Sequence, residues 1–168
     1  PEQIKDLADD YYYGRGEKIQ NYKKAFDLYR IAADRGNETA KISLGCCYRD
    51  GKGVERDYAK AYEIFVDVAD NGNASAINLV GICYYSGQGV EQNYEKAVEL
   101  YRISADKGFD KAISNLGSCY YNGNGVERDY SKAVELYNKA ILLGNASAYN
   151  GLAICYEKGN GVEKDMNK

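Results

Sequence analysis

The segment GKGVERDYAKA at residues 51–61 decides the fold, because close copies of it recur along the chain. GQGVEQNYEKA covers residues 87–97, GNGVERDYSKA covers 123–133 and GNGVEKDMNK covers 159–168, so the period is 36 residues. A fixed period of roughly 20–50 residues is typical of solenoids, in which each unit buries its apolar face only against its neighbours. The sequence therefore predicts a stack of repeated units.

Apolar residues recur every three to four positions on both sides of this segment, which is the spacing of one helix face. The set before the segment is Ala40, Leu44, Cys47 and Tyr48, and the set after it is Tyr58, Ala61, Phe65, Val68 and Ala69. Each unit is therefore predicted to hold two helices. First helices are expected near 39–49, 75–85, 111–121 and 147–157, and second helices near 58–70, 94–106 and 130–142.

Asparagine or aspartate stands just before most of these helices, where its side chain can accept a hydrogen bond from an unpaired backbone N–H. The predicted caps of second helices are Asp57, Asn93 and Asp129, and those of first helices are Asn37, Asn73 and Asn145. The last three asparagines also open glycosylation sequons. Helix capping explains asparagine at this position without a sugar.

Composition excludes several classes of function. The 168 residues carry a net charge of -3 with both signs interspersed, so no basic patch indicates a nucleic-acid partner. No apolar run approaches the roughly 20 residues that span a bilayer. The chain has no histidine, which excludes Ser-His and Cys-His relays and removes the commonest metal ligand. Neither a metal site nor a cofactor is predicted.

Three phrases carry a resemblance to a known family: A-x-x-x-L-G-x-C-Y at residues 40–48, G-x-G-V-E-x-D-Y-x-K-A at 51–61, and L-Y-x-x-A at 28–32. They resemble the Sel1-like repeats, which are relatives of the tetratricopeptide repeats. The resemblance covers the whole chain and implies an all-α fold, a right-handed α-solenoid of helix-turn-helix Sel1-like repeats in a single domain. The expected units are 1–36, 37–72, 73–108, 109–144 and a truncated 145–168.

The resemblance implies a scaffold or adaptor that binds other proteins, and not an enzyme. The face of the first helices opposite the packing stripe is expected to line a concave groove for a protein or an extended peptide. The predicted groove residues are Lys5, Tyr12, Ile42, Cys46, Arg49, Asn78, Ile82, Tyr85, Lys111, Ser114, Tyr121, Asn150, Ile154 and Glu157. A structural spacer without a ligand stays open as an alternative.

A weak serine hydrolase is a remote alternative. Ser104 and Lys107 match the S-x-x-K pattern of penicillin-recognising enzymes, but the companion S-D-N and K-T-G motifs are missing. The pair also falls at the end of a predicted second helix, so we expect a structural role for it.

Four cysteines, one per unit, lie on the packing stripe: Cys47, Cys83, Cys119 and Cys155. Stacked helices lie about 8–10 Å apart, which is beyond the roughly 7 Å Cα separation that a disulfide tolerates. We therefore expect unpaired, buried thiols, with Cys46 pointing away from the stripe as the most accessible one. Of the 18 tyrosines, all but six are assigned to repeat-internal packing; the six are Tyr12, Tyr13, Tyr62, Tyr85, Tyr121 and Tyr149.

The last residues, 165–168, align with Asp57–Lys60 at the opening of a second helix. The final first helix is therefore expected to lack its own partner, with Leu152, Cys155 and Tyr156 only half covered. From this pattern we expect further repeats in the natural protein, and self-association of the present chain through its open C-terminal end.

Overall fold

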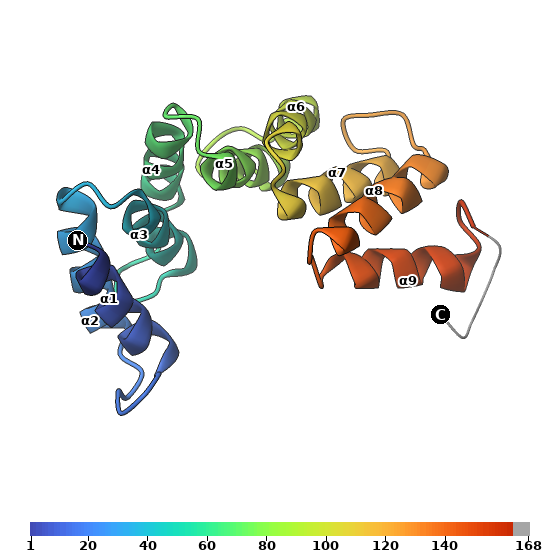
Figure 1. Cartoon of the computed structure of the whole chain (residues 1–168). Helices are drawn as coiled ribbons and strands as arrows, with labels where there is room; N and C mark the ends of the chain where they lie inside the picture. The colour runs from blue at the N-terminus through green and yellow to red at the C-terminus, as the bar shows by residue number, and fades with distance from the viewer. Residues whose placement is uncertain (163–168) are drawn as a thin grey trace. The chain divides into compact units, whose positions relative to one another are not determined.

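The computed structural model describes residues 1–162, so the prediction for residues 165–168 falls outside the described part of the chain. Over residues 1–162 the chain forms nine α-helices and no strand (Figure 1). The helices are α1 (Glu2–Tyr13), α2 (Tyr22–Asp34), α3 (Glu38–Asp50), α4 (Tyr58–Ala69), α5 (Ala74–Ser86), α6 (Tyr94–Asp106), α7 (Asp110–Asn122), α8 (Tyr130–Leu142) and α9 (Ala148–Lys158). The predicted all-α repeat fold is confirmed, and every predicted helix end agrees within one residue.

The helices belong to two compact units. Unit 1 comprises residues 1–76 and 88–90, with α1 to α4 and the start of α5. Unit 2 comprises the rest of α5 and the helices α6 to α9. Among the described residues, no helix combines the length and the apolar character that a bilayer crossing requires.

Both cores combine small residues with aromatic residues. In unit 1, Ala8, Ala25, Ala32 and Ala40 are fully buried and let helices approach closely around Phe26 and Tyr29. In unit 2, the buried rings of Tyr101 and Tyr137 pack with Ile113, Leu116 and Leu136. The ring of Tyr137 lies so close to Gly117 that an added Cβ would stand 3.0 Å from it. This contact explains why a first helix carries glycine at that position.

The predicted caps are confirmed. The side chains of Asp57, Asn93 and Asp129 accept from the backbone N–H three residues ahead, at 2.8–2.9 Å. Asn37, Asn73 and Asn145 do the same at the first helices, at 2.7–3.2 Å. Each cap satisfies one of the backbone donors that a helix start leaves unpaired. Position 109, where the repeat carries phenylalanine, makes no side-chain cap bond.

Within unit 2 the loop between α7 and α8 presses against the start of α6. Gly125 has a φ of +71°, and a Cβ at this residue would overlap the carbonyl oxygen of Tyr94. Glycine is therefore required here both for the left-handed backbone and for the close approach. The loop that Gly125 holds in place also carries Asn124, which contributes to the candidate site.

Within residues 1–162 none of the five thiols forms a disulfide, and Cys46 is the most exposed of them, as predicted. The expected half-covered end needs a correction. Leu152 and Tyr156 are half-buried, but Cys155 is fully buried. It belongs to the core cluster of unit 2, which also contains residues of α6, α7 and α8.

Candidate functional site

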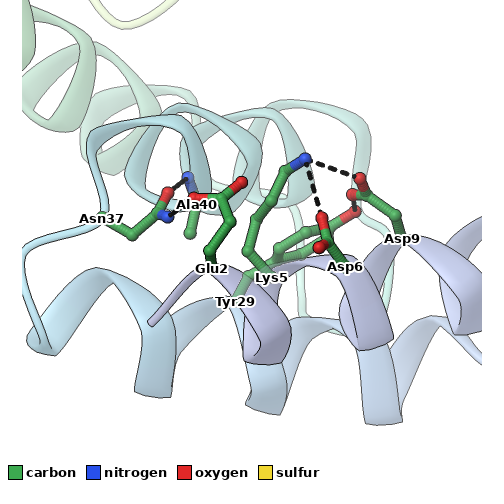
Figure 2. Close-up of polar contacts among 7 residues, drawn as sticks. All are labelled: Glu2, Lys5, Asp6, Asp9, Tyr29, Asn37 and Ala40. Atoms are coloured by element: carbon green, nitrogen blue, oxygen red, sulfur yellow. Dashed lines mark hydrogen bonds and ion pairs between the residues drawn. The ribbon is translucent and has the colours of Figure 1, made fainter.

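In unit 1, the predicted groove residue Lys5 is part of a closed polar network on α1 and α2 (Figure 2). Its ammonium group lies 3.0 Å from Asp9 and 3.5 Å from Asp6. The second oxygen of Asp9 accepts a hydrogen bond of 2.6 Å from the hydroxyl of Tyr29. The hydrogen bond to Asp9 raises the pKa of Lys5, while burial raises the pKa of Tyr29. The charge of Lys5 is therefore already compensated inside the protein.

Two further polar residues of unit 1, Asn37 and Arg49, are engaged as well. Asn37 accepts from the backbone N–H of Ala40 and donates to Glu2 at 2.7 Å, which ties α1 to the start of α3 (Figure 2). The guanidinium of Arg49 bonds the carboxylate of Asp50 through two nitrogens, at 2.7 and 3.0 Å. The polar groups of Asn37 and Arg49 are thus engaged within unit 1.

The remaining predicted residues of unit 1 are partly buried. The ring of Tyr12 packs at 5.2 Å from Tyr22 and 6.1 Å from Tyr29, and burial raises its pKa to about 12. Ile42 and Cys46 are half-buried on α3. Tyr12 therefore acts chiefly as packing material.

In unit 2, the predicted residues come from α5, α7 and α9, and we call this set the first-helix face. It consists of Asn78, Ile82, Tyr85, Lys111, Ser114, Tyr121, Asn150, Ile154 and Glu157. Asn78 is only 3% exposed, and its side-chain oxygen accepts a hydrogen bond of 2.9 Å from Asn115. This bond joins α5 directly to α7. Because Asn78 is buried and bonded, its replacement is expected to reduce stability as well as to alter the surface.

A small cavity opens beside this amide pair. Its volume is about 170 Å³, and its lining comes from three successive first helices or their starts: Asn78, Ile82, Lys111, Ser114, Asn115, Asn145 and Ser147. Four of the predicted groove residues are thus brought together. Asn150, Ile154 and Glu157 are exposed on α9 and are not among the lining residues.

Three lining residues are not among the predicted groove residues: Asn115, Asn145 and Ser147. Asn115 lies four residues after Lys111, so helical spacing alone places it on the same side of α7. Asn145 was assigned only to capping, although its cap uses just the side-chain oxygen. Both amides could have been found by asking which polar residues lie near Lys111 in the stack.

The other two predicted tyrosines, Tyr85 and Tyr121, have hydroxyls that are already hydrogen-bonded within the protein. The hydroxyl of Tyr85 accepts from Asn124 at 2.7 Å, and that of Tyr121 accepts from Asn160 at 3.0 Å. Their rings also pack against Tyr94 and Tyr130, at 5.0 and 5.2 Å between centroids. Both tyrosines are therefore held in fixed positions, at the opposite end of the first helices from the cavity.

The Sel1 repeat pattern matches residues 6–37, 39–72, 74–109, 110–145 and 146–168. The chain belongs to the Sel1 repeat family. The structure of a protective antigen present in uropathogenic Escherichia coli strains is 35% identical, with a TM-score of 0.76 over 96% of this chain and 34% of that chain. A Sel1 repeat protein from Oxalobacter formigenes is 30% identical, with a TM-score of 0.80 over 96% of this chain and 66% of that chain.

This Sel1 repeat chain thus spans less than two thirds of either relative. Helicobacter pylori cysteine rich protein B shares the fold, with 22% identity and a TM-score of 0.58 over 79% of this chain and 96% of that chain. No curated protein sequence matches the chain.

Two other candidate sites of this Sel1 repeat chain are an open hollow and the serine of the S-x-x-K pattern. An open hollow of about 710 Å³ is lined by Arg102, Arg128 and Tyr130, but also by Glu127 and Asp129, so its charges are balanced. Ser104, the serine of the S-x-x-K pattern, is fully buried and therefore closed to a substrate in this structure. Within residues 1–162, no cluster of three potential metal ligands occurs.

Proposed function

We propose that this chain binds an extended segment of a partner protein on the first-helix face of unit 2. Sel1 repeat proteins commonly mediate protein–protein interaction. The observation that carries the proposal for this chain is the cavity beside Asn78, which collects polar side chains from α5, from α7 and from the residues just before α9. An elongated ligand that crosses successive repeats is the kind of ligand that such a lining fits.

The contrast between the two units favours unit 2. In unit 1 the polar groups of the corresponding helices bond to one another, as in the pairs of Lys5 with Asp9 and Arg49 with Asp50. In unit 2 the amide pair of Asn78 and Asn115 uses one acceptor and one donor, which leaves further hydrogen-bonding capacity on each side chain. Unmatched polar groups at the edge of a cavity are the groups that a ligand can pair.

Site-specific photo-crosslinking tests this proposal. A photoreactive residue replaces Ser114 at the cavity, or Asn138 on the exposed surface of α8 as the matched control. We expect one partner segment to crosslink at position 114 but not at 138, and the crosslink to weaken when Lys111 is changed to glutamate. Equal crosslinking at both positions, or none at position 114, would favour the structural spacer instead.

A further inference from the structure

Several hydrogen-bond donors in the lining of the unit 2 cavity have no partner in the part of the chain that the structure describes. Asn145 uses its oxygen to cap α9, so its amide nitrogen remains a donor. Asn78 likewise uses its oxygen, as acceptor for Asn115, and keeps its own amide nitrogen. Lys111 adds an ammonium group with three donors, and Ser114 adds a hydroxyl. A ligand group with several acceptors can pair with these donors.

The charge of the cavity lining favours an anionic ligand group. Lys111 is its one charged lining residue, and no carboxylate lines it. Within residues 1–162, Lys111 takes part in no ion pair, whereas Lys5 in unit 1 contacts both Asp6 and Asp9. The cavity also lies against the first turn of α7 and the residues before α9, where helix dipoles present their positive ends. An anionic group would therefore be attracted to a site that the protein itself leaves uncompensated.

We infer that this cavity binds a single carboxylate group of the partner segment. The inference rests on the proposed function and adds the chemistry of the contact. A carboxylate is acceptor-only, with about four lone-pair positions for the amides, the hydroxyls and the ammonium. The volume of about 170 Å³ suits one side chain or one chain end rather than a whole small-molecule ligand.

The lining favours a carboxylate over a phosphate. A phosphorylated side chain carries a charge of about −1.5 to −2 and is usually met by several arginines with their paired donors. Arginine is absent from the cavity lining, and a single lysine matches a single negative charge. The open hollow near Arg102 and Arg128 does have arginines, but Glu127 and Asp129 in its lining oppose any anion.

NMR titration of the full ¹⁵N-labelled chain tests the inference, because asparagine side-chain amides give their own signals. The probes are blocked alanine pentapeptides with glutamate, glutamine or phosphoserine at the centre, and an all-alanine pentapeptide with a free carboxyl end. We expect the glutamate peptide to shift the amide signals of Asn78 and Asn145. Its affinity should exceed that of the glutamine peptide about three- to fivefold, the effect of one exposed ion pair.

Two lysine variants supply the control. Lys111→Gln should lower the affinity for the glutamate peptide about three- to fivefold, while Lys107→Gln, an exposed lysine outside the cavity lining, should leave it unchanged. If the free-carboxyl peptide binds more tightly than the glutamate peptide, the carboxylate comes from a chain end. If the glutamate peptide binds more tightly, it comes from an acidic side chain.

Three results would overturn the inference. Equal affinity for the glutamate and glutamine peptides at the cavity would remove the carboxylate preference while leaving peptide binding on this face intact. Stronger binding of the phosphoserine peptide would replace the carboxylate by a phosphate. Binding of the acidic peptides that leaves the signals of Asn78 and Asn145 unmoved would reject the cavity itself, and only the crosslinking experiment would then bear on the proposed function.

Discussion

The hydroxyl of Tyr85 accepts a hydrogen bond of 2.7 Å from the side-chain amide of Asn124, a residue 39 positions further along the chain. Tyr121 and Asn160 repeat this relationship at 3.0 Å, again 39 positions apart. Each bond connects the end of a first helix to the loop that follows the next first helix. A tyrosine on the first-helix face is thus a link between neighbouring repeats as well as part of a surface.

Removing this link should weaken unit 2. Tyr85→Phe keeps the ring contact with Tyr94 but takes away the acceptor of Asn124, so we expect a loss of about 0.5–1.5 kcal/mol in the free energy of unfolding. Urea denaturation followed by circular dichroism measures it. Tyr149→Phe serves as the control, because Tyr149 is 59% exposed. An equal effect of both changes would show that the bond to Asn124 contributes nothing.

Replacing Asn78 should affect stability as well as binding. Asn78→Ala leaves Asn115 without its acceptor in a site that is 3% exposed, which should cost about 1–3 kcal/mol. Asn150→Ala on the exposed side of α9 should stay within about 0.5 kcal/mol. A double-mutant cycle with Asn115→Ala measures the coupling, and strictly additive losses would contradict a direct bond between the two amides.

Two glycines separate backbone strain from close approach. Gly125 and Gly108 both have positive φ, +71° and +82°, but a Cβ at Gly108 meets no atom within 4 Å, whereas one at Gly125 overlaps the carbonyl of Tyr94. Both alanine variants should lose about 1–2 kcal/mol from the left-handed backbone. Gly125→Ala should lose at least about 1 kcal/mol more, because overlap with rigid backbone adds strain. Identical melting temperatures for the two variants would contradict the close contact between Gly125 and the carbonyl of Tyr94.

Stability should fall at high pH. Burial raises the pKa of Cys47 and of Cys119 from 9.0 to about 12, so the unfolded chain loses these protons first. The stabilisation is complete below about pH 9 and is lost as the pH rises from about 9 to about 12. Urea unfolding at several pH values measures the slope. Cys119→Ala should reduce it, and an unchanged slope would mean that the thiol is open to solvent.

Alkylation should distinguish the thiols. Cys46 is half-buried while the other four are buried, and a thiol reacts only as an accessible thiolate. At pH 8 we expect one equivalent of iodoacetamide to react quickly, at Cys46, and the rest only after denaturation. Mass spectrometry of the digested protein locates the label. Rapid labelling of Cys83 or Cys119 in the native chain would contradict the buried stripe.

The sequence predicted the helices well because their signals are local. A cap such as Asp57 acts on the N–H of Lys60, three residues away, and an apolar stripe such as Leu44 with Cys47 lies within one helix. The cavity was only half predicted for the opposite reason. Its amide pair joins Asn78 to Asn115, 37 positions apart. The partner of Tyr85 is Asn124, whose position depends on the conformation of the loop after α7. Residue type on a helix face does not reveal whether a polar group is already paired.

The repeated contact of a loop glycine with the preceding second helix also bears on how such a chain can change length. Gly53 meets the backbone of Tyr22 in unit 1, and Gly125 meets that of Tyr94 in unit 2, with the same geometry. Every 36-residue block therefore carries both halves of one joint. A tandem duplication of a block would therefore insert a unit that packs against its neighbours without further substitutions. Each added unit would also contribute a new set of first-helix side chains, so that the binding surface could evolve to fit a longer ligand.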